Sequence, residues 1–144
     1  MSNKAKNDKR SILVDTEALL DVFEPAFMTM PKIRRIHGAA VRMEEAAYDI
    51  IKHYYIAYNL DDEDELKEKE HYIREMIGSF GILQSSFKRL MKVKIDTQKK
   101  SDPEAVQQMG MFTDKVKLDL AKSMERIEEG MLKWKNSIKK KHHD

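Results

Sequence analysis

Residues 30–58 read MPKIRRIHGAAVRMEEAAYDIIKHYYIAY, and apolar side chains recur through them in steps of three and four. This stripe consists of Ile33, Ile36, Ala40, Met43, Ala47, Ile50, Tyr54 and Ala57. Residues three and four apart share one face of an α-helix, so the spacing predicts a long helix packed lengthwise against other helices. Because packing occupies the inner face of such a helix, the pattern argues against an enzyme with its active site inside the fold.

Apolar stripes with the same period occur in three more segments. The first predicted helix begins at an N-cap, Asp15 or Thr16, and should kink or break near Pro25 because proline cannot donate a helical hydrogen bond. The other two span about 62–93 and 113–137. Four segments that each bury one stripe predict an all-α fold, an up-and-down four-helix bundle with long antiparallel helices.

Small residues within the stripes predict close helix contacts. In the segment 30–58 they are Gly38, Ala39, Ala40, Ala46 and Ala47. In the segment 62–93 they are Gly78 and Gly81, which we expect to mark a tight helix crossing.

The chain of 144 residues is sized for one domain. We expect the bundle to span 12–138, with disordered tails at 1–11 and 139–144. The sequence has no Cys, which excludes disulfides, thiol catalysis and zinc–thiolate sites. No apolar run approaches the roughly 18 residues of a membrane span, and the polar N-terminus lacks the apolar core of a signal peptide. We therefore expect a cytoplasmic protein without a membrane partner.

The net charge of +2 conceals an uneven distribution. Residues 61–70 carry seven acids against Lys67 and Lys69, whereas residues 88–100 carry six bases against Asp96. Bases therefore gather at the ends of the predicted helices, which is typical of a phosphate-contacting surface. Solvated helix ends are also often rich in lysine, and composition alone does not choose between these interpretations.

A basic cluster opens the second predicted helix and consists of Lys32, Arg34, Arg35 and Arg42. Arginine suits bidentate contacts with phosphate, so the cluster is a candidate nucleic-acid contact. Nothing in it would recognise a base sequence, so we expect binding through backbone charge and shape. The alternative is salt bridging to Glu44, Glu45 or a neighbouring subunit.

Tyr55 and Tyr58 lie beside the apolar stripe near the end of the second helix. They predict either a helix–helix or subunit interface, or a platform on which bases stack, and packing is the commoner role. Trp134 lies between two lysines, but its place on the last stripe favours the core.

Two spacings raise the question of a metal site. Glu68 and His71 form a single E-x-x-H, whereas di-iron bundles need two copies, and Asp49 and His53 lie one helical turn apart. A solvated face and a surface ion pair are the better interpretations. No Ser–His–acid arrangement or phosphate-binding glycine loop is present, so we expect no enzyme activity, metal or other cofactor.

Three stretches resemble one family, the accessory variability determinant proteins of diversity-generating retroelements. They are MPKIRRIHGAA at 30–40, YYIAY at 54–58 and MERIEEGMLKWK at 124–135. The family belongs to a four-helix-bundle superfamily that includes proteins encoded by ribosomal-RNA intervening sequences.

The resemblance implies a ring of five identical subunits that binds a reverse transcriptase together with RNA and DNA. Such rings support mutagenic retrohoming and have no catalytic residues of their own. By position, Lys88, Arg89 and Lys92 on the third helix join Arg34, Arg35 and Arg42 as candidate contacts with nucleic acid or polymerase. The alternative is a structural protein–protein interaction module without a nucleic-acid role.

Overall fold

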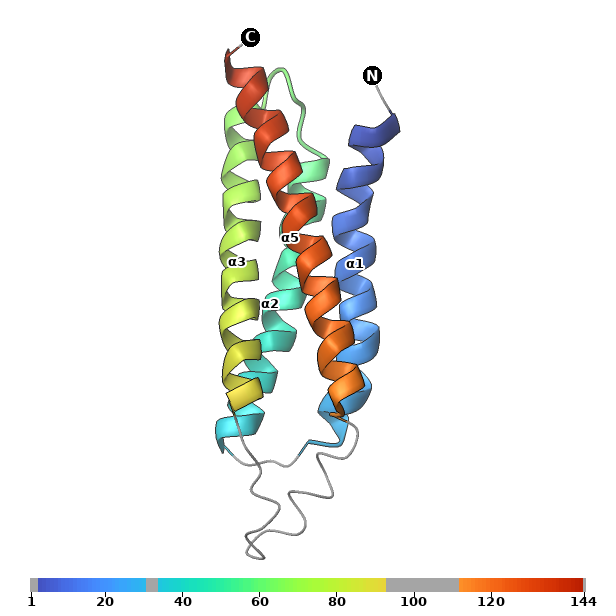
Figure 1. Ribbon diagram of the computed structural model, residues 1–144. Coiled ribbons are helices and arrows are strands. Elements are labelled where there is room, and N and C mark those ends of the chain that lie inside the picture. Colours follow the sequence, from blue (N-terminus) through green and yellow to red (C-terminus); the bar gives the residue numbers. More distant parts are fainter. Residues whose placement is uncertain (1–2, 31–33, 93–111, 144) are drawn as a thin grey trace, which may run out of the picture.

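The fold was analysed in a computed structural model that describes residues 3–30, 34–92 and 112–143. These residues form four helices and no strand: α1 (Asn3–Met28), α2 (Arg34–Tyr58), α3 (Leu66–Lys92) and α5 (Asp114–His143). The helices run alternately down and up, and the first residues of α1 lie at the same end of the bundle as the last residues of α5 (Figure 1). The prediction of an up-and-down four-helix bundle is confirmed.

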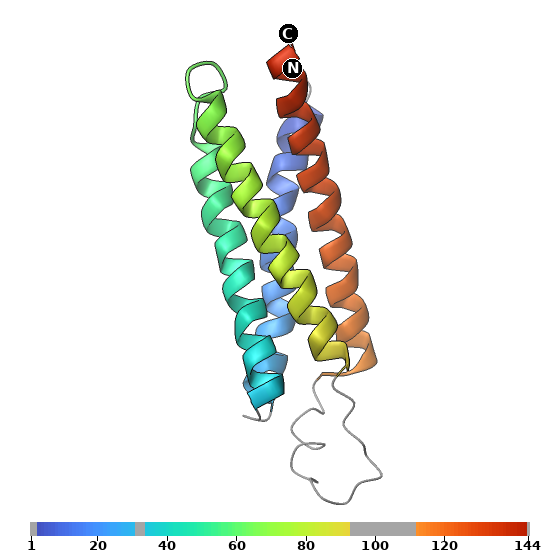
Figure 2. The same ribbon diagram turned by 90° about the vertical axis from the view of Figure 1, so that its left-hand side faces the viewer.

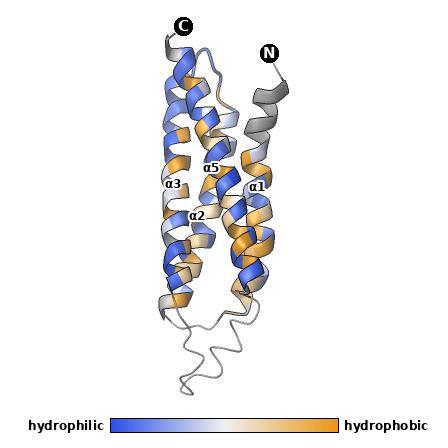
Figure 3. Ribbon diagram, viewed as in Figure 1, coloured by the Kyte–Doolittle hydropathy of each residue, from blue (hydrophilic) through white to orange (hydrophobic). Residues whose placement is uncertain are grey.

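The helices form two closely packed pairs. α2 packs most extensively on α3 and α1 on α5, whereas the α1–α2 and α3–α5 contacts are smaller. After a quarter turn, Figure 2 shows α3 in front of α1, with α2 on one side and α5 on the other. Apolar and polar residues alternate along every helix (Figure 3), so that each helix turns one stripe inward.

The predicted stripe of α2 is the centre of one continuous core. Ala40, Met43 and Ala47 have no exposed surface, and Ile50 and Tyr54 are at most 3% exposed. Ala39 and Ala46 are also buried, so short side chains recur along the inner face of α2 between the larger Met43 and Ile50. Short side chains allow close approach, in keeping with the extensive α2–α3 contact.

α1 begins at Asn3, well before the predicted N-cap, so residues 3–11, which the sequence placed in a disordered tail, are helical. Ile12 extends the buried stripe by two turns beyond Leu19. Thr16 occupies a buried position in that stripe, and its hydroxyl donates to the carbonyl oxygen of Ile12 at 2.6 Å. A threonine whose hydroxyl bonds one turn back is tolerated inside a helix and need not cap one. The predicted break at Pro25 is absent because α1 continues to Met28.

The ends of α2 and α5 follow ordinary capping rules. α2 ends at Tyr58, where the Asn59 side-chain amide donates to the carbonyl of Tyr55 at 2.9 Å. Thr113 caps α5, because its hydroxyl accepts the Val116 N–H at 3.2 Å. Gly78 and Gly81 are exposed, and no atom lies within 4 Å of a Cβ built on either, so the predicted tight crossing there is wrong.

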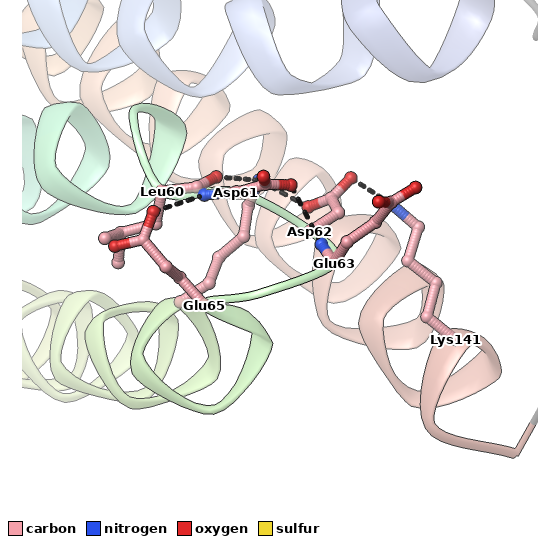
Figure 4. Close-up of polar contacts among 7 residues, drawn as sticks. Leu60, Asp61, Asp62, Glu63, Glu65 and Lys141 are labelled. Atoms are coloured by element: carbon pink, nitrogen blue, oxygen red, sulfur yellow. Dashed lines mark hydrogen bonds and ion pairs between the residues drawn. The ribbon is translucent and has the colours of Figure 1, made fainter.

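The acidic connection between α2 and α3 is an ordered cap (Figure 4). The Asp61 side chain accepts the Glu63 N–H at 2.9 Å, and the Glu65 carboxylate accepts the Asp61 N–H at 3.1 Å. Because carboxylates favour the positive end of a helix, this arrangement also suits the start of α3.

Lys69 of α3 binds the connection between α2 and α3 and links it to the core. Its side chain is 5% exposed, and its Nζ lies 2.6 Å from Asp62 Oδ1 and donates to the carbonyl of Leu60 at 3.1 Å. The ammonium also lies 5.9 Å from the centre of the Trp134 ring. A buried lysine is tolerated only when its charge is paired in this way.

Asp62 also binds Lys141, and residues 139–143, which the sequence placed in a disordered tail, belong to α5. α5 continues to His143, and Ile138 remains buried near its end. The acidic connection thus supplies a partner for Lys141 in the last turn of α5. Although partial burial disfavours the charged carboxylate, its bonds to Lys141 and Lys69 lower the pKa of Asp62 to about 2.

Replacement of Ala47 by leucine tests the close packing of α2. The larger side chain has no space at a fully buried site, so Ala47→Leu should lower the free energy of unfolding by about 1–3 kcal/mol in a urea titration. The matched control is Ala18→Leu at an exposed position of α1, which should change stability by less than about 0.5 kcal/mol. Equal stability of the two variants would show that α2 tolerates bulk at its inner face.

Asp62→Asn tests the charged cap at this end of the bundle. Since folding lowers the pKa of Asp62 from 3.8 to about 2, its stabilisation is full above about pH 5 and disappears as the pH falls through 2. Because Asp62 is about one-third exposed, we expect a loss of about 1–2 kcal/mol at pH 7.

Urea titrations of the wild type and Asp62→Asn at pH 7 and pH 2 measure this difference. The exposed Asp64, changed to Asn, serves as the control from the same connection. A difference between wild type and Asp62→Asn that is the same at both pH values would refute the assignment.

Candidate nucleic-acid interface

The third helix ends with three basic side chains in the positions that the sequence indicated. Lys88, Arg89 and Lys92 are all exposed, and none of them forms an ion pair with another described residue. Bases in the last turn of a helix are stabilised by its negative end. Their cationic groups are therefore held at the surface without a fixed protein counter-ion among the described residues.

The basic residues of α2 lie at this same end of the bundle. Arg34 and Arg35 form the first turn of α2, whereas Lys32 lies outside the described residues. Arg42 is exposed, and its guanidinium lies back over Gly38, 3.7 Å from the place that a Cβ there would take.

The register of the two helices follows from one contact between them. The rings of His53 and Tyr72 stack with their centres 6.2 Å apart. Because α2 and α3 are antiparallel, Arg34, which is 19 residues before His53, lies level with Met91, which is 19 residues after Tyr72. The structure therefore brings the start of α2 and the basic end of α3 together, which helical periodicity alone does not show.

A group of carboxylates lies on the seam between α1 and α2. The Tyr48 hydroxyl donates to Glu24 Oε2 at 3.1 Å, and Glu24 and Glu44 interact directly. The pKa of Glu44 is raised above its ordinary value. Burial is the largest cause, and the hydrogen bond to Glu24 and the charge of Glu24 act in the same direction. Glu44 therefore interacts with Glu24, and none of the described ion pairs joins it to Arg42. Salt bridging of the cluster to Glu45 or to a neighbouring subunit stays a prediction.

Tyr55 and Tyr58 lie at the opposite end of α2 from these bases. Their side chains are 48% and 46% exposed, and both rings contact Tyr54, at centroid distances of 5.6 and 5.7 Å. Arg34 and Tyr58 are 24 residues apart, which is about 36 Å along a helix. The two tyrosines are thus outside the basic cluster, whether they serve a subunit contact or base stacking.

Trp134 belongs to the core, as its place on the stripe predicted. It is 2% exposed, and its ring lies 5.8 Å from that of Tyr54 in an edge-on arrangement. Tyr54 and Trp134 therefore pack against each other in the core, beneath the Lys69–Asp62 pair.

The residues considered for a metal site are dispersed. His53 stacks on Tyr72 instead of pairing with Asp49, and His71 lies 4.0 Å from Glu75 on an exposed face. In the part of the chain that the structure describes, no three side chains of His, Asp or Glu are grouped to hold a metal ion. Among the same residues, no helix has the length and hydropathy of a membrane span.

Comparison with known proteins gives no match: no family model, curated protein or solved structure is similar to this chain at a significant level.

Proposed function

We propose that this chain is a non-enzymatic accessory protein that binds nucleic acid through the end of the bundle where α2 begins and α3 ends. The observation that carries the proposal is the meeting of two basic segments there, with Arg42, Lys88, Arg89 and Lys92 exposed. Phosphate backbones are attracted to such surfaces through charge, and the contacts position nucleic acid without selecting its sequence.

The proposed partner is the reverse transcriptase of a diversity-generating retroelement. Support for this partner comes from the resemblance of residues 30–40, 54–58 and 124–135 to the accessory family of those elements. In this role the protein, as a homo-oligomer, would hold RNA and its complementary DNA near the polymerase during mutagenic retrohoming. The four-helix fold is compatible with that family, and a bundle whose inner faces are filled by packing suits a protein that acts through its surface.

A second candidate function is a protein–protein interaction module. It is favoured by apolar side chains that remain about half exposed, such as Tyr55, Met91 and Leu118. The two functions differ in one respect that is simply measured, because only the first requires affinity for nucleic acid.

Alanine substitutions of Arg42, Lys88, Arg89 and Lys92 test the proposed surface. Fluorescence anisotropy with labelled single-stranded RNA and DNA of unrelated sequences measures the affinity over a range of salt concentrations. We expect the fourfold variant to bind roughly tenfold or more weakly to every sequence. The slope of log affinity against log salt should become shallower by roughly 3 units, because about 0.7 units are lost per phosphate contact on a single strand.

The control variant removes the same charge from the opposite end of the bundle. Its four alanines replace Lys52, Lys67, Lys139 and Lys140, which are all exposed. Equal weakening by the two variants would show that net charge, and not this surface, determines binding. Absence of nucleic-acid binding by the wild type, together with capture of a protein partner, would establish the interaction module instead.

A further inference from the structure

A groove separates α3 from α5, which have the smallest mutual contact among the neighbouring helix pairs. Its volume is about 490 Å³, and its floor is apolar, with Phe87, Met91, Ala121 and Met124. At one end Gln84 donates to the Glu128 carboxylate across the two helices at 3.1 Å. From Gln84 to Lys92 the groove follows about two turns of α3, or about 12 Å.

The floor is suited to a partner's apolar side chains. Phe87 and Met124 are each 7% exposed and join the groove to the core, whereas Met91 is 46% exposed at its edge. Methionine side chains are flexible and adapt to the shape of what they contact. An apolar hollow of this kind on a charged surface marks a binding site more strongly than single exposed hydrophobic residues do.

The two rims of the groove have opposite charge. Lys88 and Lys92, one turn apart, stand on the α3 rim, whereas Glu125 and Glu128 stand on the α5 rim. None of the described ion pairs joins one rim to the other. An occupant that placed acids beside α3 and bases beside α5 would therefore satisfy both rims.

We propose that this groove binds an amphipathic α-helix of a partner protein, with acidic residues along one flank of its apolar stripe and basic residues along the other. Two turns of such a helix present anchors at positions i, i+3 or i+4, and i+7, which match the length of the groove. Reversing the helix would exchange its flanks, so the charges also fix its direction. The inference rests on the apolar floor and the two rims of the groove, and the lysines of its α3 rim, Lys88 and Lys92, also belong to the proposed nucleic-acid surface.

Other occupants fit these observations less well. A small apolar molecule would fill the floor but leave both charged rims without a partner. A second copy of the chain placed groove to groove would bring two hollows together, and convex helices fit grooves better than other grooves do.

A cross-linked helical peptide of about 14 residues tests the proposal directly. It carries leucine at i, i+4 and i+7, glutamate on one flank and lysine on the other, with fluorescein at its terminus. We expect saturable binding to the full chain by anisotropy, and at least tenfold weaker binding to Met91→Glu. Ile82→Glu is the matched control, because Ile82 is 53% exposed on α3 and does not line the groove.

The charges of the rim provide an independent readout. The double variant Lys88→Glu, Lys92→Glu should bind the mixed-charge peptide more weakly than the wild type does. It should instead prefer a peptide with lysine on both flanks. No binding of the mixed-charge peptide, or equal weakening by Met91→Glu and Ile82→Glu, would overturn the proposal. Self-association of the wild type that Met91→Glu abolishes, measured by light scattering, would also overturn it by making a second copy the occupant.

Discussion

The packing of small and apolar side chains along α2 is the constraint on which the rest of this molecule depends. Ala40, Met43 and Ala47 are wholly buried, and α2 makes its most extensive contact with α3. Because apolar packing fills most of the interior, most of the described polar residues lie at the ends and on the outer faces of the bundle. The two best-defined candidate surfaces among the described residues, the basic end and the α3–α5 groove, both lie on the outside of the bundle.

The polar residues also divide the bundle into two different ends. Where α2 passes into α3, Asp62 pairs with both Lys69 and Lys141 and so ties three segments of the chain together. At the other end, Lys88 and Lys92 have no carboxylate partner among the described residues. The charge of Asp62 is thus paired at one end, whereas Lys88 and Lys92 have no described partner at the other. A chain with only a modest net charge can in this way still present a strongly basic surface.

Sequence periodicity predicted what depends on apolar spacing, including the four helices, the α2 stripe and the core position of Trp134. Predictions from periodicity were wrong where a polar residue occupies an inner position. Thr16 reads as an N-cap and Lys69 as a surface residue, yet each satisfies its polar group locally and is buried. The prediction of a tight crossing at Gly78 was wrong for a different reason, because a small residue permits a close helix contact without requiring one. The candidate basic residues could be identified from the sequence. That they meet at one end of the bundle became visible only with the antiparallel register of α2 and α3. The groove could not be predicted at all without the positions of α3 and α5.

The central claim is that the bundle binds nucleic acid at one end. Acylation of lysines with and without bound RNA, followed by mass spectrometry of the peptides, tests it most directly. Our account predicts that RNA protects Lys88 and Lys92, whereas Lys139 and Lys140, which are also exposed to solvent but lie at the other end, remain fully reactive. Protection of Lys139 and Lys140 with Lys88 and Lys92 still reactive would contradict it.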